Sequence, residues 1–135
     1  IPSIAVQGYD AERRVIFWNW ASESLYGYTP GEALGLKLED LIIPDAMRQG
    51  VIDAVAAWVA GGPAVPAGEL TLRHKDGSPV PVFSSHVMQV GASGPEMYCI
   101  DIDMTARKRA EAELEQHWVK VEGEGGEGCG VRSER

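Results

Sequence analysis

Cysteine is scarce in this sequence, and a long apolar run and an excess of positive charge are missing altogether. The 135 residues include two cysteines, Cys99 and Cys129, which are too few and too far apart for a disulfide framework or a zinc site. We expect Cys99 to be a small buried residue and Cys129 to lie in a tail. No apolar run approaches the roughly 20 residues that a membrane-spanning helix needs.

The charge balance argues against nucleic acid as a partner. The net charge is −8 at pH 7, and an acidic surface repels phosphate backbones. Apolar residues make up 44% and charged residues 24% of the chain, which is typical of one soluble, globular domain. No signal peptide opens the sequence, so we expect a cytoplasmic protein with no membrane partner. Because the first residue is Ile1, we also expect a fragment of a longer protein.

The first third of the chain predicts a hairpin followed by short helices. Two apolar runs, at residues 4–6 and 15–18, are separated by Gly8-Tyr9-Asp10, as in a β-hairpin. Asn19 is placed to cap a short helix over residues 20–26, which Gly27 would close. Thr29-Pro30-Gly31-Glu32 is a capping box with proline at the first helical position, and Gly35 can stop that helix.

A longer amphipathic helix and three strands are predicted next. Pro44 opens the helix, in which Met47, Val51, Val55 and Trp58 recur at helical spacing, and the glycines at 61 and 62 end it. Extended runs follow over residues 69–74, 80–90 and 97–104, separated by tight turns. This order predicts an α+β fold with short helices on one face of a five-stranded antiparallel sheet.

The sequence after this sheet is different in character. Residues 1–105 form the predicted domain, and residues 106–118 are rich in Ala, Glu, Lys and Arg, which favours a C-terminal helix. Ala110, Leu114 and Trp118 give this helix only a narrow apolar stripe, so we expect it to pack on the sheet or on a second copy. Residues 119–135 are rich in Gly and Glu and are expected to be disordered.

Three motifs carry a resemblance to a known family. In residues 17–35 a predicted strand ends in Asn19 and a short helix ends in Gly27-Tyr28. His74-Lys75-Asp76-Gly77-Ser78 follows at a turn, and Asp103-Met104-Thr105 precedes Arg107 and Lys108. In this order and spacing the motifs resemble those of PAS (S-box) sensory domains over roughly residues 1–116.

The resemblance implies a sheet that encloses a central cavity together with its short helices. Domains of this family serve as input modules of histidine kinases, cyclic-di-nucleotide enzymes and transcription regulators. They hold flavin, haem, another chromophore, a small organic acid or nothing, so the fold leaves the ligand open. The expected signal runs through Asp103 and Thr105 into the C-terminal helix, within a homodimer joined to an effector domain.

Two cofactors are argued against by the residues at the family's ligand positions. Leu38 stands where light-oxygen-voltage relatives carry their reactive cysteine, and Leu72 and Val82 stand where these relatives carry asparagines that bind flavin. Haem needs an axial ligand, and residues 45–60 contain no histidine; Met47 is expected to be a core residue. Non-covalent FAD stacked on Trp18 or Trp20 stays a remote alternative, and a small organic ligand or none is expected.

The resemblance also suggests which residues face the cavity. Alternation along the last strand favours Tyr98, Ile100 and Ile102 as its buried face, whereas the resemblance favours Met97, Cys99 and Asp101, and we adopt the second. The third strand would contribute Leu70, Leu72 and His74, although His74 is also a candidate surface residue beside its turn. The candidate cavity residues are Asn19, Leu38, Met47, Leu72, Val82, Ser84, His86, Cys99 and Asp101.

This register places Ser84 near Asp101 and His86 near Cys99. A buried carboxylate needs a partner, which His86, Lys37 or a ligand donor could supply; an internally satisfied pair and a solvent-facing Asp101 remain open.

These expectations leave several functions to compare. The leading one is a ligand-sensing module, and the second is a ligand-free platform for dimerisation or docking. Ser84, His86 and Asp101 are also the residue types of a nucleophilic triad, but no nucleophile elbow or oxyanion-hole motif accompanies them. We therefore expect no enzymatic activity.

Overall fold

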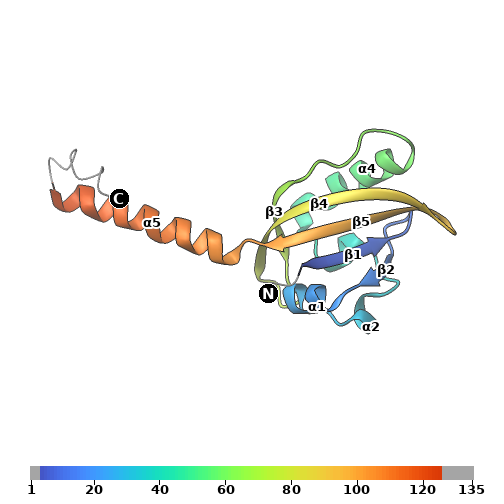
Figure 1. Ribbon diagram of the computed structural model, residues 1–135, viewed down its shortest axis with the longest axis horizontal. Coiled ribbons are helices and arrows are strands. Elements are labelled where there is room, and N and C mark those ends of the chain that lie inside the picture. The colour runs from blue at the N-terminus through green and yellow to red at the C-terminus, as the bar shows by residue number, and fades with distance from the viewer. Residues whose placement is uncertain (1–3, 126–135) are drawn as a thin grey trace. The chain divides into compact units, whose positions relative to one another are not determined.

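The computed structural model describes residues 4–125 and divides the chain into two compact units. The boundary lies between Asp103 and Met104. The first unit holds the sheet and the short helices, and the second holds the C-terminal helix (Figure 1).

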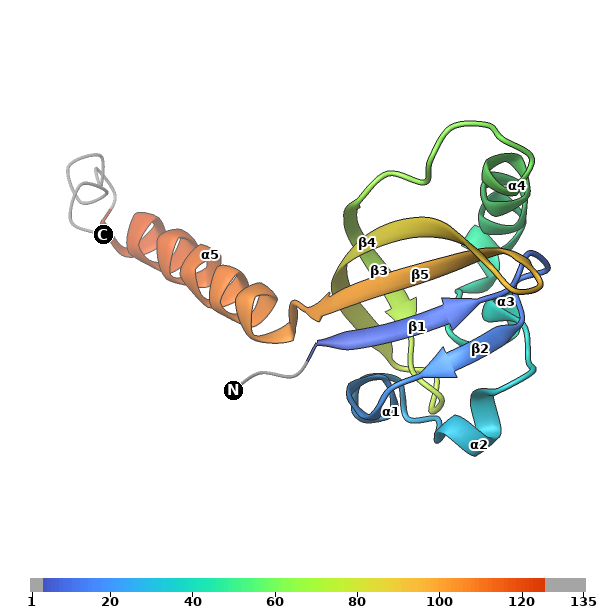
Figure 2. The same cartoon turned by 45° about the vertical axis from the view of Figure 1, so that its right-hand side comes forward.

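The first unit is built on five antiparallel strands in the order β2-β1-β5-β4-β3 (Figure 2). The last strand lies at the centre because it pairs with both the first strand and the fourth. The predicted α+β class and the five-stranded antiparallel sheet are therefore confirmed. The strands are β1 (Ala5–Tyr9), β2 (Val15–Trp18), β3 (Gly68–Arg73), β4 (Pro79–Gly91) and β5 (Gly94–Asp103).

Helix α1 (Trp20–Tyr26) begins and ends at the residues that the sequence indicated. The side chain of Asn19 accepts a hydrogen bond from the backbone N–H of Ser22 at 2.9 Å, which satisfies a donor that the helix cannot pair internally. At the other end Gly27 has φ +86°, and its N–H donates to the carbonyl of Glu23. This left-handed conformation suits glycine. Local capping thus fixes the direction of the helix and the position of Tyr26.

Helix α2 (Pro30–Ala33) has the predicted capping box. The N–H of Glu32 donates to the Thr29 hydroxyl at 3.1 Å, and the N–H of Thr29 donates to the Glu32 carboxylate at 2.9 Å. Two unpaired helix donors are satisfied reciprocally, as a capping box requires.

Helix α3 (Leu38–Leu41) was not predicted. It is a single turn without a side-chain cap, too short for helical periodicity to reveal. An ion pair holds it instead: Arg13 donates from Nε and Nη2 to the two oxygens of Glu39, at 2.9 and 3.0 Å. The backbone carbonyl of Arg13 also accepts a hydrogen bond from the N–H of Leu38 at 2.9 Å. The β1–β2 hairpin is thereby tied to α3.

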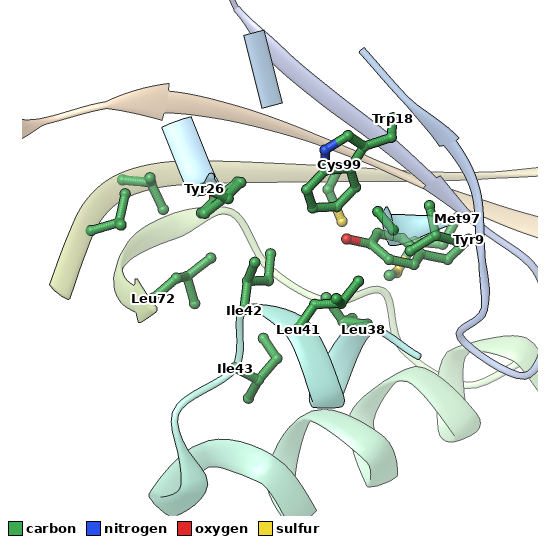
Figure 3. Close-up of a cluster of buried hydrophobic side chains, with 14 of the residues drawn as sticks. Tyr9, Trp18, Tyr26, Leu38, Leu41, Ile42, Ile43, Leu72, Met97 and Cys99 are labelled. Atoms are coloured by element: carbon green, nitrogen blue, oxygen red, sulfur yellow. The ribbon is translucent and has the colours of Figure 1, made fainter. Parts of the chain in front are cut away.

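The predicted helix after Pro44 consists of a 3-10 turn (Asp45–Met47) followed by α4 (Arg48–Val59). Val55 is buried on its inner face, and Met47, Val51 and Trp58 pack against the core. The aromatic side chains of the core come from the hairpin and α1, whereas the aliphatic ones come from α3, the segment after it, α4 and the strands (Figure 3). Helices α1 to α4 each contribute a buried side chain to this one core, so they pack on one face of the sheet, as predicted; these side chains are Tyr26, Ala33, Leu38 and Val55.

The second unit contains α5 (Thr105–Gly125), which extends past the predicted end at Trp118. Lys120 and Glu122 continue the run of good helix formers, and one interior glycine costs only about 1 kcal/mol relative to alanine. The Gly/Glu-rich tail that was predicted to be disordered spans residues 119–135. Residues 126–135 of it lie outside the described part of the chain. None of the described helices is both long enough and apolar enough to cross a bilayer.

Candidate functional site

A cavity of about 360 Å³ lies between the inner face of the sheet and helices α3 and α4. Its wall is mainly aliphatic, and the segment before β3 closes it with Val65 and Pro66. Gly50 and Ala54 of α4 line it while being exposed, so the cavity opens to solvent beside this helix. Its polar side chains come from β1, β4 and β5 and are Gln7, Ser84, His86 and Asp101.

Two hydroxyl groups satisfy the buried carboxylate of Asp101, which is 1% exposed. Tyr26 donates to Oδ2 and Ser84 donates to Oδ1, each at 2.6 Å. The predicted protein partners, His86 and Lys37, are therefore wrong, and the internally satisfied alternative describes the carboxylate. Tyr26 replaces them because the capped end of α1 directs its side chain toward β5.

His86 is the last side chain of this hydrogen-bond network, because it contacts Ser84 through Nε2. The Ser84 hydroxyl has one proton, which it gives to Asp101, so Nε2 of His86 at 3.1 Å must donate to the Ser84 oxygen. The neutral ring then presents a lone pair at Nδ1. This atom is buried and has no hydrogen-bond partner in the described part of the chain.

The charge state of His86 follows from its surroundings. Burial lowers the pKa of the imidazole, and this effect exceeds the opposing effects of the Asp101 charge and of the Val65 and Pro66 carbonyl groups. These carbonyl groups lie close enough to favour the charged ring, but neither forms a hydrogen bond with Nδ1. The ring is therefore neutral at physiological pH.

The other polar groups near the cavity stay protonated. Burial raises the pKa of Tyr9 and of Cys99 well above their usual values, and the Asp101 charge raises both further. Tyr9 donates to Oε1 of Gln7 at 3.4 Å, and Gln7 donates to the Ser22 hydroxyl at 3.0 Å. Cys99 is therefore a neutral thiol, a poor nucleophile.

Most of the sequence-predicted cavity residues line the cavity, whereas Asn19 and Val82 do not. The side chain of Asn19 has a structural role instead, because it caps α1. It also accepts a hydrogen bond from the Val6 N–H at 3.0 Å and donates one to the Ile4 carbonyl at 2.9 Å. Val82 is 1% exposed and belongs to the packed core. Binding roles for the others remain predictions, and the residues that line the cavity as expected are Leu38, Met47, Leu72, Ser84, His86, Cys99 and Asp101.

The face of β5 chosen from the resemblance is the inner one. Met97, Cys99 and Asp101 are buried, whereas Ile102 is 48% exposed. Ser84 pairs with Asp101 and His86 with Cys99, as predicted. Alternation misleads here because both faces of this central strand carry apolar side chains.

The two remaining strand-end predictions concern His74 and the signalling residues. His74 follows β3 outside the cavity, and its Nδ1 accepts from the Asp76 N–H at 3.1 Å within the turn. Asp103 ends β5 and Thr105 begins α5, with Met104 between them. Their role in signal transfer stays a prediction.

Gln7 and Tyr26 were missed by sequence reasoning. Gln7 lines the cavity, and Tyr26 supports Asp101. Alternation in β1 could have found Gln7, because it lies between the inward-facing Ala5 and Tyr9. No local signal links Tyr26 to Asp101, which is 75 residues away.

The order of the three polar groups does not match a nucleophilic triad. In a triad the histidine lies between the carboxylate and the serine and takes the serine proton. Here Ser84 lies between Asp101 and His86 and gives its proton to the carboxylate. Among the described residues, no group of three or more His, Cys, Asp or Glu side chains could hold a metal ion.

Comparison with known proteins supplies a family. A family model described as the PAS fold matches residues 15–101. A PAS domain from Colwellia psychrerythraea is 26% identical with TM-score 0.65, and the match covers 76% of this chain and 87% of that one. No curated protein matches.

Two further solved structures indicate the settings of similar domains. A domain of a sensory box sensor histidine kinase/response regulator from Geobacter sulfurreducens is 25% identical with TM-score 0.58, covering 74% of this chain and 82% of that one. The PAS domain of the quorum-sensing receptor RpfR from Cronobacter turicensis, in complex with BDSF, is 14% identical with TM-score 0.58. That match covers 75% of this chain and 93% of the receptor domain. The matched family model, supported by the sheet order and by the similar solved PAS domains, shows that this chain belongs to the PAS family, whose members commonly serve as sensory modules of signalling proteins.

Proposed function

We propose that this domain senses a small, largely apolar molecule bound in the cavity and passes the signal into α5. The observation that carries the proposal is an open cavity of about 360 Å³ with aliphatic walls and a few polar groups at one end. Such a combination is typical of small-molecule sites. A packed, ligand-free core would leave no space of this size.

The path to α5 follows from the position of β5. This strand supplies Met97, Cys99 and Asp101 to the cavity and ends one residue before Met104. A ligand that favours one of two arrangements of β5 shifts their populations. We place the domain in the cytoplasm as the input module of a larger signalling protein, such as a sensor kinase or cyclic-di-nucleotide regulator, without enzymatic activity of its own.

Toluene, an apolar probe without a polar head, tests whether the cavity binds ligands. We expect its addition to shift the NMR signals of Leu72 and Met97, which line the cavity, and also those of Met104 and Thr105. Ala54→Phe places a ring at the cavity mouth and is expected to weaken toluene binding at least tenfold. Extraction of the purified wild type should release an apolar compound that mass spectrometry detects. Extraction of Ala54→Phe should release none.

The control for this variant lies on the same helix. Ala56 is exposed and does not line the cavity, so Ala56→Phe should bind toluene like the wild type. Absence of both a released compound and a toluene-induced shift would overturn ligand sensing. Cavity shifts without a change at Met104 and Thr105 would overturn only the signalling path.

A second candidate function, dimerisation, is favoured by the outer face of the sheet. Phe17 is 46% and Val87 49% exposed, and the Phe17 ring lies 6.5 Å from that of Tyr98. A contiguous apolar face of this kind marks an interaction surface. We propose a second copy of the chain as its partner; the outward-facing apolar residues are Val6, Phe17, Phe83, Val87, Tyr98, Ile100 and Ile102.

A charge introduced at the middle of this face should separate the copies. Val87→Lys is expected to raise the dimer dissociation constant at least tenfold in sedimentation velocity, because the lysine would be desolvated at the interface. Thr71→Lys on β3 at the sheet edge is the control and should change little. Equal effects of the two substitutions, or a wild type that stays monomeric at every concentration, would contradict dimerisation through this face.

A further inference from the structure

Three of the four polar side chains in the cavity wall are both hydrogen-bonded within the protein and out of a ligand's reach. Asp101 accepts hydrogen bonds on both carboxylate oxygens, one of them from Ser84. The amide of Gln7 accepts a hydrogen bond at its oxygen and donates one from its nitrogen. Gln7 is 0%, Asp101 1% and Ser84 2% exposed, so a molecule in the cavity cannot contact their polar atoms.

The fourth side chain, His86, offers a ligand no hydrogen bond either. Its Nε2 lies 3.1 Å from the Ser84 oxygen and donates to it. Its Nδ1 is buried, and the backbone carbonyl groups of Val65 and Pro66 lie beside the ring. Because the protein itself shields Nδ1, both nitrogen atoms of the ring are closed to a bound molecule.

The inner part of the cavity therefore acts as a hydrocarbon surface, although four polar residues belong to its wall. A ligand group that hydrogen-bonds to water would lose those bonds on entering and would find no partner among these side chains. Burial of a polar group without a partner is unfavourable. The part of the ligand that lies inside is expected to be free of donors and acceptors.

Conditions are different at the mouth of the cavity. Gly50 and Ala54, one turn apart on α4, and Pro66 line the cavity and are exposed. A Cβ added at Gly50 would have no neighbour within 4 Å outside its own helix, so the mouth is not crowded there. A polar group held at this place keeps its contact with water and loses no hydrogen bonds.

The size of the cavity limits the buried part of the molecule. At the roughly 30 Å³ that a water-sized group occupies in a liquid, a cavity of about 360 Å³ holds on the order of ten non-hydrogen atoms. A pure hydrocarbon of that size dissolves poorly, because hydration of apolar surface is unfavourable. A molecule that reaches the site through water is therefore expected to carry a polar group as well.

We propose that the ligand is a single-headed molecule, whose hydrocarbon tail fills the cavity and whose polar group, at one end, stays at the mouth beside Ala54. This inference rests on the proposed ligand-sensing function and names the class and the orientation of the ligand. Molecules with a polar group at both ends, such as diols and dicarboxylic acids, are excluded because one end would be buried without a partner.

Two probes of equal chain length test the buried end. 1-Octanol and 1,8-octanediol differ in one hydroxyl group, and only the diol has to bury one. 1-Octanol should displace toluene and bind at least tenfold more tightly than the diol, since an unpaired hydroxyl weakens binding by about five- to a hundredfold. Nuclear Overhauser contacts should join the methyl end of 1-octanol to Leu72 or Met97, and its CH2OH protons to Ala54.

A charge placed at the mouth tests the position of the head. Ala54→Lys should raise the affinity for octanoate relative to that for 1-octanol about fivefold, the effect in water of opposite unit charges about 4 Å apart. Ala56→Lys is the matched control, because Ala56 is exposed on the same helix and does not line the cavity. It should leave the ratio of the two affinities unchanged.

Each other outcome counts against a specific step. A diol that binds as tightly as 1-octanol would overturn the apolar inner end. Overhauser contacts with the two ends reversed, or equal effects of the two lysines, would overturn the head at the mouth. Toluene binding without 1-octanol binding would overturn the single-headed class while leaving the cavity a binding site. Failure of toluene itself would contradict ligand sensing instead.

Discussion

Replacing Glu39 by glutamine is expected to lower the free energy of unfolding by about 3–5 kcal/mol, the usual cost of removing one partner from a buried ion pair. The Glu39 side chain is 2% exposed and that of Arg13 is 13% exposed, and two hydrogen bonds join them. The substitution keeps the side-chain volume but leaves the Arg13 guanidinium largely desolvated without a countercharge. It also releases α3, which has no side-chain cap of its own.

Urea denaturation of the wild type, Glu39→Gln and a control should measure this effect. The control is Glu12→Gln, because Glu12 and Arg14 form an exposed pair at 3.5 Å, and such pairs contribute little. We expect its midpoint to match that of the wild type. Similar midpoints for the two variants would contradict a stabilising role for the Arg13–Glu39 pair.

The same ion pair predicts how the difference depends on pH. Burial raises the pKa of Glu39, but the hydrogen bonds from Arg13 and the Arg13 charge outweigh it and leave the pKa below its ordinary value. The folded state therefore binds fewer protons than the unfolded state, whose glutamate titrates near pH 4.3. The stability gap between wild type and Glu39→Gln should be full above about pH 4.3 and shrink at lower pH. A constant gap between neutral and strongly acidic pH would contradict this assignment.

Replacing Tyr26 by phenylalanine is expected to lower the free energy of unfolding by about 1.5–3 kcal/mol, the contribution of a hydrogen bond to a charged group. Tyr26 is fully buried and is one of the two hydroxyl donors to Asp101. Without it, Oδ2 would be desolvated and unpaired. The substitution also removes the direct link between α1 and the central strand.

Tyr28→Phe is the matched control for this variant. The Tyr28 hydroxyl donates to the neutral Leu41 carbonyl at 3.4 Å, and both tyrosine rings lie against Trp18. It should cost less, because the bond is longer and its acceptor carries no charge. Urea midpoints that fall equally for the two variants would contradict the special role of Asp101.

A double-mutant cycle separates the hydrogen bond from general packing. Asp101→Asn removes the charge to which the Tyr26 hydroxyl donates. The loss of unfolding free energy caused by Asp101→Asn should therefore be smaller in the Tyr26→Phe background than in the wild type. Additive costs would show that the two side chains act independently, contrary to the 2.6 Å contact.

Local features of this protein were predictable because their determinants lie within a few residues of one another. Asn19 and Gly27 define α1, and Thr29 with Glu32 defines the start of α2. Turn residues and alternation placed the strands to within a few residues of their observed bounds. The single-turn α3 escaped prediction because one turn shows no period, and its support, Arg13, lies 26 residues earlier.

The inner face of β5 shows where residue patterns stop being informative. Tyr98, Ile100 and Ile102 are the more apolar set, yet the buried set is Met97, Cys99 and Asp101. Burial of Asp101 is tolerated only because Tyr26 and Ser84 satisfy it, and that compensation is invisible along the chain. A resemblance to a known fold was needed to choose the correct face.

By itself, then, the sequence determined the fold class and every strand and helix of the first unit except α3, because caps, turns and alternation act over short distances. The tertiary structure alone decided that Tyr26 and Ser84 satisfy Asp101 and that Arg13 holds α3. Hydrogen bonds between distant segments depend on strand register and on how the helices pack against the sheet. Those are properties of the folded chain as a whole, which no local stretch of sequence encodes.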